Sequence, residues 1–256
     1  MINQTGIAEA YFSTRIGGVS ELEDCASMNL NMFKKLDIEN SKINMKLFCD
    51  TIGFPVEKLV TNRELHSNNV RIVDERDILD DPYYEPSYTP CDGIITQSKN
   101  IWLYGYNSDC AIFMLLDSIK KVIAIAHAGW KGSINGILPN TIKAMCDNFG
   151  SNPKDILASC APSIGVCCFE VDKPCVDMFI DYDKSFEKFI VPPTKNTEKY
   201  HIDLRGVNKS VLLSCGLLPE HIAISDHCTM CQDDLYYSYR RCKGTNGVNG
   251  IFLRLI

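Results

Sequence analysis

Cys110 and His127 are the two residues of this 256-residue chain whose types and spacing first suggest chemistry. Cys110 precedes an apolar segment, residues 111–116, and His127 follows another, residues 122–126, with the turn residues Asp117-Ser118 between them. If the two segments pair as a hairpin, a thiol and an imidazole meet at its open end. The same pattern also fits a small buried cysteine and a histidine that caps the next helix.

His66 is a third residue of a soft metal-ligand type, in a predicted turn between the strands 59–65 and 70–73. Two histidines and one cysteine, each at a strand end or turn, match the three protein ligands of a catalytic zinc ion. The fourth coordination position of such an ion stays open for water or a substrate oxygen. Metal binding is therefore one hypothesis for His66, Cys110 and His127.

A cysteine nucleophile is the competing hypothesis, and it uses the same atoms. In it, His127 or His66 removes the proton of Cys110, and Asp92 or Asp109 orients the histidine. The sequence alone leaves both hypotheses open.

Two further motifs have residue types suited to ligands. Cys228-x-x-Cys231 resembles half of a zinc ribbon or a redox motif, but the chain contains no second Cys-x-x-Cys to complete a four-thiolate site. Near the N-terminus, Gly17-Gly18 would let the backbone approach a ligand, and Arg15 offers a rigid donor fork for a phosphate or carboxylate. A plain turn with a surface arginine fits that second motif equally.

Composition narrows the class of protein. Apolar residues make up 45% of the chain, and 26 basic against 32 acidic residues give a net charge of -6. This charge provides no basic field for nucleic acid or an anionic membrane. We find no signal peptide after Met1 and no apolar run near the ~20 residues of a spanning helix. Thirteen cysteines without a signal peptide indicate reduced thiols in the cytoplasm.

Strand and helix patterns alternate irregularly, which favours mixed sheets with covering helices over a doubly wound parallel sheet. Expected strands cover residues 7–12, 59–65, 70–73, 94–96, 101–106, 111–116, 122–126, 156–159, 222–224 and 251–255. Expected helices cover residues 38–51, 133–149, 174–180 and 205–213. In the first helix, Ile43, Leu47, Phe48 and Ile52 fall on one apolar face.

Six motifs occur in an order that resembles the laccase-domain family of YfiH type, over nearly the whole chain. They are Thr14-Arg15-x-Gly17-Gly18-Val19-Ser20, Cys91-Asp92-Gly93, Asp109-Cys110, His127-Ala128-Gly129-Trp130-Lys131-Gly132, Ala161-Pro162-Ser163-Ile164-Gly165 with Cys168-Phe169-Glu170-Val171, and Cys228-Thr229 with Ser238-Tyr239-Arg240-Arg241. The run from His127 to Gly132 is the most specific of these.

The resemblance implies a single α/β (α+β) domain over residues 1–256, with mixed sheets packed centrally and helices outside. It implies a zinc-dependent enzyme that phosphorolyses adenosine, inosine, guanosine and methylthioadenosine and deaminates adenosine. Its metal ligands carry over to His66, Cys110 and His127. A bacterial branch of the family edits peptidoglycan precursors, so an amidohydrolase that uses the same cysteine and histidines is the alternative.

The other site residues take roles consistent with phosphorolysis, which needs a nucleoside and phosphate as partners. Asp92 is the first candidate for an acid or base and Asp109 the second. Arg15 is a catalytic candidate that binds anions. Arg240, Arg241 and Lys131 are substrate-binding candidates, the arginines for phosphate. Copper is a poorer candidate than zinc, because five histidines cannot fill multicopper clusters.

Two features bear on substrate choice. The family usually has Gln-x-His-Gly around its first ligand, whereas this chain has Glu64-Leu65-His66-Ser67, so the substrate preference stays open. The acidic segment 74–90 contains Tyr83, Tyr84 and Tyr88, which could stack on a purine. As a third hypothesis, this segment is the interface of a non-catalytic protein.

Overall fold

The antiparallel strands β6 (Ala111–Asp117) and β7 (Val122–Ala128) form the predicted hairpin at the centre of a six-stranded sheet. The computed structural model describes residues 1–256 except 34–36, 63, 84–88, 195–197 and 245–246. In spatial order the strands of the sheet are β12 (Ile222–Ile224), β8 (Ile156–Cys160), β6, β7, β4 (Gly93–Thr96) and β3 (Val70–Ile72). The outer pairs β12–β8 and β3–β4 are parallel and the inner pairs antiparallel, so the sheet is mixed as expected.

A four-stranded sheet packs on one face of the six-stranded sheet. Its order is β1 (Ala8–Phe12), β13 (Asn249–Leu255), β5 (Trp102–Asn107) and β2 (Leu59–Thr61). Buried aliphatic side chains such as Leu103, Ile123 and Leu253 fill the space between the two sheets. A smaller sheet consists of β10 (Ile190–Val191), β11 (Tyr200–Ile202) and β9 (Glu170–Val171).

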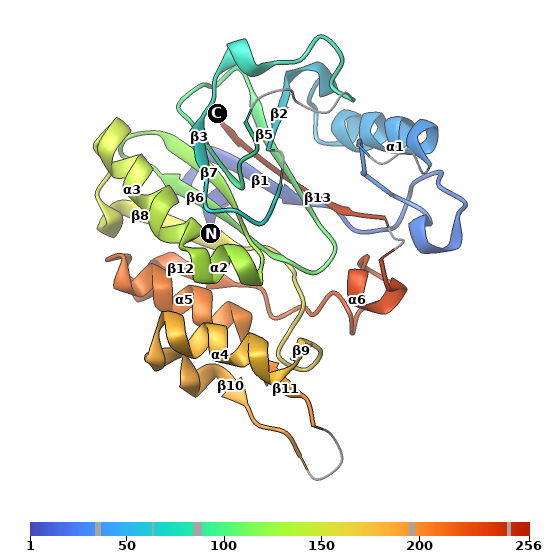
Figure 1. The fold of residues 1–256 in the computed structure, drawn as a ribbon. Coiled ribbons are helices and arrows are strands. Elements are labelled where there is room, and N and C mark those ends of the chain that lie inside the picture. The colour runs from blue at the N-terminus through green and yellow to red at the C-terminus, as the bar shows by residue number, and fades with distance from the viewer. Residues whose placement is uncertain (34–36, 63, 84–88, 195–197, 245–246) are drawn as a thin grey trace.

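Helices cover the outer faces of both large sheets (Figure 1). The helices on the six-stranded sheet are α2 (Trp130–Asn135), α3 (Ile137–Phe149), α4 (Lys173–Tyr182) and α5 (Leu204–Ser214). The helix α1 (Ile38–Thr51) packs on the four-stranded sheet through Trp102, Tyr104 and Phe252. A short helix, α6 (Tyr239–Cys242), precedes β13. The expected fold, mixed central sheets with helices outside, is confirmed.

Short 3-10 helices occur at Ile2–Thr5, Glu23–Cys25, Val56–Lys58, Glu75–Asp77, Pro153–Asp155, Lys184–Phe189 and Pro219–His221. Among the described residues, no helix combines the length and the apolar character that crossing a membrane requires.

The predicted apolar face of α1 packs inward only in part: Phe48 and Ile52 contact the core. Ile43 and Leu47 are 49% and 41% exposed, whereas Asn44 and Met45 are fully buried. Asn44 points inward because its side chain satisfies the N-terminal loop: Nδ2 donates to Ser20 and to the carbonyl of Ser27. These hydrogen bonds satisfy loop groups that would otherwise be buried without partners. They stabilise the protein more than an apolar side chain would at that position.

The predicted helix 133–149 is two helices. Gly136 has a φ of +85°, which ends α2 after Asn135 and begins α3. Because this left-handed conformation suits glycine, the chain turns here without strain. At its other end, α2 begins earlier than expected, at Trp130, just after the strand that carries His127.

Candidate metal centre

The β6–β7 hairpin brings Cys110 and His127 together at its open end. Ile112 pairs with His127 in the strand register, and Cys110 immediately precedes β6. Asn107 holds the backbone of Cys110 by donating from Nδ2 to its carbonyl, with an N–O distance of 2.7 Å. His66 reaches the same end from a loop, since β2 ends at Thr61 and not at the predicted Leu65.

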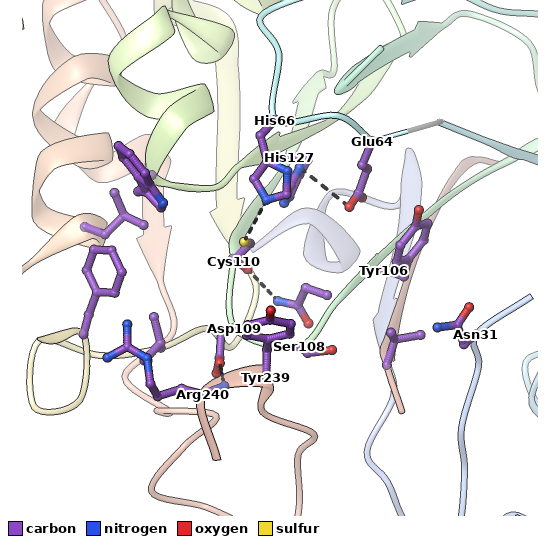
Figure 2. A pocket seen from close by; sticks show the side chains of 16 residues that line it. Asn31, Glu64, His66, Tyr106, Ser108, Asp109, Cys110, His127, Tyr239 and Arg240 are labelled. Carbon is purple, nitrogen blue, oxygen red and sulfur yellow. Dashed lines mark hydrogen bonds and ion pairs between the residues drawn. The ribbon is translucent and has the colours of Figure 1, made fainter. Parts of the chain in front are cut away.

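The ligand atoms of His66, Cys110 and His127 all lie within 4.8 Å of one another. The Sγ atom of Cys110 is 3.9 Å from Nε2 of His66 (Figure 2). Gly129 makes this approach possible, because a Cβ atom there would lie only 3.0 Å from Cys110 Sγ and 3.1 Å from His66 Cδ2. The structure therefore brings together the three residues predicted as metal ligands.

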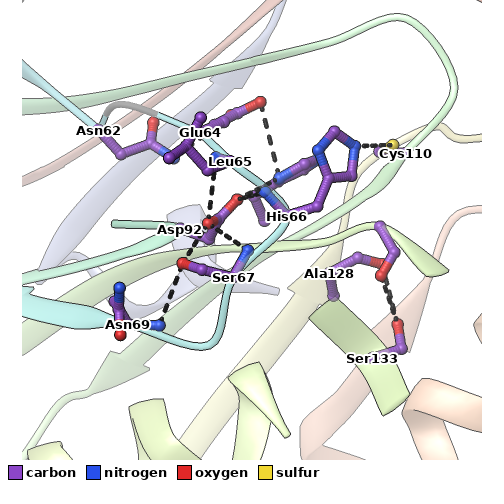
Figure 3. Close-up of polar contacts among 12 residues, drawn as sticks. Asn62, Glu64, Leu65, His66, Ser67, Asn69, Asp92, Cys110, Ala128 and Ser133 are labelled. Carbon is purple, nitrogen blue, oxygen red and sulfur yellow. Dashed lines mark hydrogen bonds and ion pairs between the residues drawn. The ribbon is translucent and has the colours of Figure 1, made fainter. Parts of the chain in front are cut away.

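Asp92 contacts two of the three predicted ligands, His127 and His66, and Figure 3 shows its bonds to the loop that carries His66. Its Oδ1 atom lies 2.8 Å from His127 Nδ1, which leaves Nε2 of that ring for the cluster. Its carboxylate also accepts hydrogen bonds from the backbone N–H groups of Leu65, His66 and Ser67 and from the Ser67 hydroxyl. These bonds stabilise the left-handed backbone of His66, whose φ is +59°.

The electrostatics of the cluster favour an anionic Cys110 sulfur and a cationic His127 ring. Burial opposes ionisation of the Cys110 thiol, but the neighbouring His127 and His66 outweigh it and lower the pKa to about 7. Burial likewise works against a charged His127, yet Glu64, Cys110 and Asp92 hold the pKa of its ring well above the ordinary value. Hydrogen bonds from His127 and Ser67 keep the pKa of Asp92 low despite its burial.

This donor set fits a zinc ion. Two imidazoles and a thiolate are ligands that zinc accepts, and three protein ligands leave a fourth position open. The carboxylate–histidine pair formed by Asp92 and His127 is the usual outer support of such a ligand. Gly129 adds a space into which no side chain intrudes.

The cluster opens into a cavity of about 510 Å³, within the ~300–1,000 Å³ typical of small-molecule sites. Aromatic rings and a few polar groups line it. The lining residues are Asn31, Glu64, His66, Tyr106, Asn107, Ser108, Asp109, Cys110, His127, Trp130, Ile164, Phe169, Leu204, Tyr239, Arg240 and Val248.

Glu64 was not predicted as a site residue, but its carboxyl group borders both the cavity and the cluster. Its side chain is 10% exposed, with Oε2 3.6 Å from His127 Nδ1. Burial raises the pKa of Glu64, although His127 opposes the shift. The sequence signal was its place two residues before His66, where the family usually has glutamine.

Aromatic lining residues were also missed. Phe169 and Tyr239 belong to the family motifs and Trp130 to the most specific one, so these motifs held the signal. Tyr106 follows from no motif. The tyrosines chosen instead lie elsewhere: Tyr83 packs beside α1, and Tyr84 and Tyr88 lie outside the described residues.

Arg240 and Asp109 are predicted site residues that line the cavity. Arg240 donates from Nη1 to the carbonyls of Cys168 and Glu170. Asp109 accepts hydrogen bonds from the Thr229 hydroxyl, the Ser238 hydroxyl and the backbone N–H of Arg240. Burial raises the pKa of Asp109, partly offset by these bonds.

The other predicted site residues lie away from the described lining of the cavity. Asp92 is fully buried behind His127. Arg15 donates to the carbonyls of Ala26, Asp233 and Glu23, and Arg241 to those of Thr229, Met230 and Tyr236. Lys131 is exposed beside the Trp130 ring. Their predicted roles in catalysis and substrate binding stay predictions.

Comparisons with known proteins give consistent matches. A family model described as multi-copper polyphenol oxidoreductase laccase matches residues 9–256. The chain is 32% identical over 244 residues to purine nucleoside phosphorylase YlmD of Bacillus subtilis, covering 93% of this chain and 85% of that protein. It is 32% identical over 191 residues to adenosine deaminase RL5 of an unknown prokaryotic organism, covering 74% and 72%. The crystal structure of Bacillus licheniformis hypothetical protein YfiH has a TM-score of 0.89 at 28% identity, covering 99% and 94%.

Proposed function

Because this chain belongs to the multi-copper polyphenol oxidoreductase laccase family, we propose that it is a zinc-dependent purine nucleoside phosphorylase that also deaminates adenosine. The observation that carries the proposal is the convergence of His66, Cys110 and His127 on one wall of a cavity of small-molecule size. Relatives named purine nucleoside phosphorylase and adenosine deaminase support the two activities. The proposed substrates are adenosine, inosine, guanosine and methylthioadenosine.

His66, Cys110 and His127 would hold the zinc ion, which when bound supplies a Lewis acid with one open position for water or a substrate oxygen. Asp92 fixes the His127 tautomer and the His66 loop through five hydrogen bonds. Its burial favours a positioning role, and the predicted acid–base role for Asp92 stays a prediction.

Arg240 is the proposed phosphate ligand. Among the described residues, only its Nη1 atom has hydrogen-bond acceptors, the carbonyls of Cys168 and Glu170, so Nε and Nη2 remain available to an anion. Cleavage of a ribose–purine bond passes through a transition state with oxocarbenium character. A guanidinium that holds phosphate beside the developing positive charge places the nucleophile without needing a nucleophilic side chain.

The aromatic lining provides a place for the purine. Tyr239, Phe169 and Trp130 come from three different segments and face one cavity with Arg240. Offset stacking of a base on such rings contributes about 1–3 kcal/mol per base in nucleic-acid sites. Figure 2 shows Glu64 and Arg240 on different sides of Cys110. When Arg240 binds phosphate, polar groups such as Glu64 therefore remain for the ribose hydroxyls. Asp109, at the same wall, stays the candidate for proton transfer.

A paired assay tests the proposal. Purified protein is incubated with adenosine, with and without phosphate, while adenine, inosine and ribose-1-phosphate are followed and bound zinc is measured. We expect adenine release only when phosphate is present and inosine formation with or without phosphate. The protein used in both assays should contain bound zinc. His127→Ala should remove both activities, whereas His221→Ala, a histidine of a distant 3-10 helix, should leave them unchanged.

Retention of phosphorolysis in a metal-free His127→Ala variant would contradict the shared metal centre. If the zinc-bound protein turns over no purine nucleoside, the proposed nucleoside activity itself is contradicted.

The peptidoglycan-precursor amidohydrolase is the second candidate, and one observation favours it. The Cys110 thiol has a pKa of about 7 beside two imidazoles, which suits a cysteine nucleophile as well as a metal ligand. Cleavage of an amide-linked sugar nucleotide by protein that is inert toward purine nucleosides would support this candidate.

We further propose that residues 1–256 act as one catalytic domain in the cytoplasm. Thirteen cysteines without a signal-peptide pattern support the cytoplasmic location. The proposed partners are a nucleoside and phosphate, without nucleic acid or a membrane.

A further inference from the structure

Four cysteines outside the cavity converge from two loops. Cys167 and Cys168 lie between β8 and β9, and Cys228 and Cys231 follow β12. Their sulfur atoms all lie within 4.8 Å of one another. The Sγ atom of Cys231 is 3.5 Å from that of Cys167 and 3.4 Å from that of Cys168. The partner that the Cys-x-x-Cys motif lacks in sequence is thus an adjacent pair of cysteines.

We propose that Cys167, Cys168, Cys228 and Cys231 bind a second metal ion, a zinc ion held by four sulfurs. A tetrahedral zinc with bonds of ~2.3 Å separates its sulfur ligands by about 3.8 Å, close to the spacing found here. A disulfide joins only two sulfurs, whereas Cys231 is equally close to two partners. A cation that takes the place of the thiol protons would bring four negative sulfurs together without mutual repulsion.

The loop around Cys228 has the hydrogen bonding of a metal-binding turn. The backbone N–H of Gly165 donates to Cys228 Sγ at 3.2 Å. The backbone N–H groups of Cys231 and Met230 also interact with this sulfur. N–H donors to a thiolate stabilise the ligand form and orient it.

Three arginines hold the backbone of the cluster and supply positive charge near it. Arg241 donates to the carbonyls of Thr229 and Met230, inside the Cys-x-x-Cys turn. Arg240 donates to the carbonyl of Cys168. The third, buried Arg205, donates to the carbonyls of Ser163 and His227, just before the two cysteine pairs. A zinc ion with four thiolates has a net charge of -2, which these guanidinium groups offset.

The position of the cluster indicates a structural role. Phe169 follows Cys168 and lines the cavity, and Thr229 follows Cys228 and donates to Asp109, another lining residue. A metal ion that joins the two loops would therefore fix this wall of the cavity. Because four sulfurs leave no open coordination position, the ion itself would not take part in the reaction.

Cobalt titration tests the proposal. Reduced protein, stripped of metal with a chelator, is titrated with Co²⁺, whose tetrahedral thiolate complexes absorb intensely in the visible and near-ultraviolet regions. We expect two equivalents per wild-type chain. The variant C167S/C168S/C228S/C231S should bind one equivalent fewer and lose the four-sulfur spectrum. The matched control C146S/C175S/C215S/C242S, four half-buried cysteines outside both clusters, should keep both equivalents.

A complementary variant keeps the result decisive if the quadruple variant does not fold. His66→Ala with Cys110→Ser removes the first site, so one equivalent with a four-sulfur spectrum should remain. Binding of no metal by this variant would overturn the proposal. Two disulfides among the four cysteines, with no cobalt uptake after reduction, would overturn it as well.

Discussion

The two ligand clusters differ in what surrounds them. His66, Cys110 and His127 stand at the end of a buried hairpin, with the Asp92 carboxylate behind them and an open side toward the cavity. The four cysteines lie on loops, with Cys167 and Cys231 exposed, and take their support from backbone N–H groups and arginines. Three ligands leave an open coordination position, as catalytic metal sites do, whereas four sulfur ligands fill the coordination shell, as in structural sites.

Arg240 connects the two clusters. Its guanidinium group lines the cavity of the first cluster and donates to a carbonyl within the second. Substitutions in the four-cysteine cluster should therefore lower activity only by displacing residues of the cavity wall. Substitutions in the first cluster should mainly lower activity, and substitutions in the four-cysteine cluster should mainly lower stability. The following predictions use that difference.

Loss of a ligand in the first cluster should have the largest effect. Cys110→Ser replaces a thiolate of low pKa with a hydroxyl that stays protonated at neutral pH and binds zinc weakly. We expect phosphorolysis and deamination to fall together, by more than the ~100-fold that loss of an outer partner costs. The measurement is kcat/KM for both reactions beside bound metal. Full activity in Cys110→Ser would show that this cluster is not the reaction centre.

The contrast between the clusters also explains what the sequence could predict. Continuous apolar runs on either side of a turn placed β6, β7 and their end residues Cys110 and His127 correctly, because a buried central strand leaves a strong local pattern. Six ordered motifs predicted the family, which the comparisons confirm. The family resemblance also marked His66 as a candidate ligand, although the strand before it ended four residues earlier than expected.

Residues that depend on contacts between distant segments could not be predicted in this way. Asn44 of α1 points inward because it donates to carbonyl groups about 15 residues away, and a helical apolar stripe cannot predict that position. Arg15 and Arg241 have the residue type of anion ligands, yet their guanidinium groups bind backbone carbonyls. Cys167 and Cys231 are 64 residues apart, and no spacing rule pairs them.

Weakening the outer support should have the next largest effect. Asp92→Asn keeps the shape of the side chain, but an amide cannot accept hydrogen bonds at both atoms from His127 and the loop 65–67. We expect zinc affinity to fall ~10–100-fold, measured by competition with a chromophoric chelator. Asp109→Asn is the control, since that carboxylate bonds to no ligand side chain. Equal losses of affinity in both variants would contradict a positioning role for Asp92.

Arg240 should distinguish the two reactions. Arg240→Met removes the proposed phosphate ligand, so KM for phosphate should rise about tenfold or more, as expected for ~1.5–3 kcal/mol of charged hydrogen bonding. Deamination uses no phosphate and should change far less. Arg240→Lys retains the charge but lacks the two-pronged guanidinium group. Its KM for phosphate should lie between those of the wild type and Arg240→Met. An equal loss of both activities would indicate that Arg240 only holds the wall through Cys168 and Glu170.

The smallest effects should come from one methyl group added at each cluster. In Gly129→Ala the new Cβ would lie 3.0 Å from Cys110 Sγ, and in Gly165→Ala it would lie 3.1 Å from Cys167 Sγ. Neither glycine has a positive φ, so crowding is the main cost, about 1 kcal/mol or somewhat more of unfolding free energy in each variant. Their activities should nevertheless differ: Gly129→Ala should lose several-fold in kcat/KM because the crowded sulfur is a reaction-centre ligand, and Gly165→Ala should keep nearly all of it. Denaturant unfolding and steady-state kinetics on the same preparations measure both quantities. If Gly165→Ala loses as much activity as Gly129→Ala at equal stability, the four-cysteine cluster does more than hold the wall.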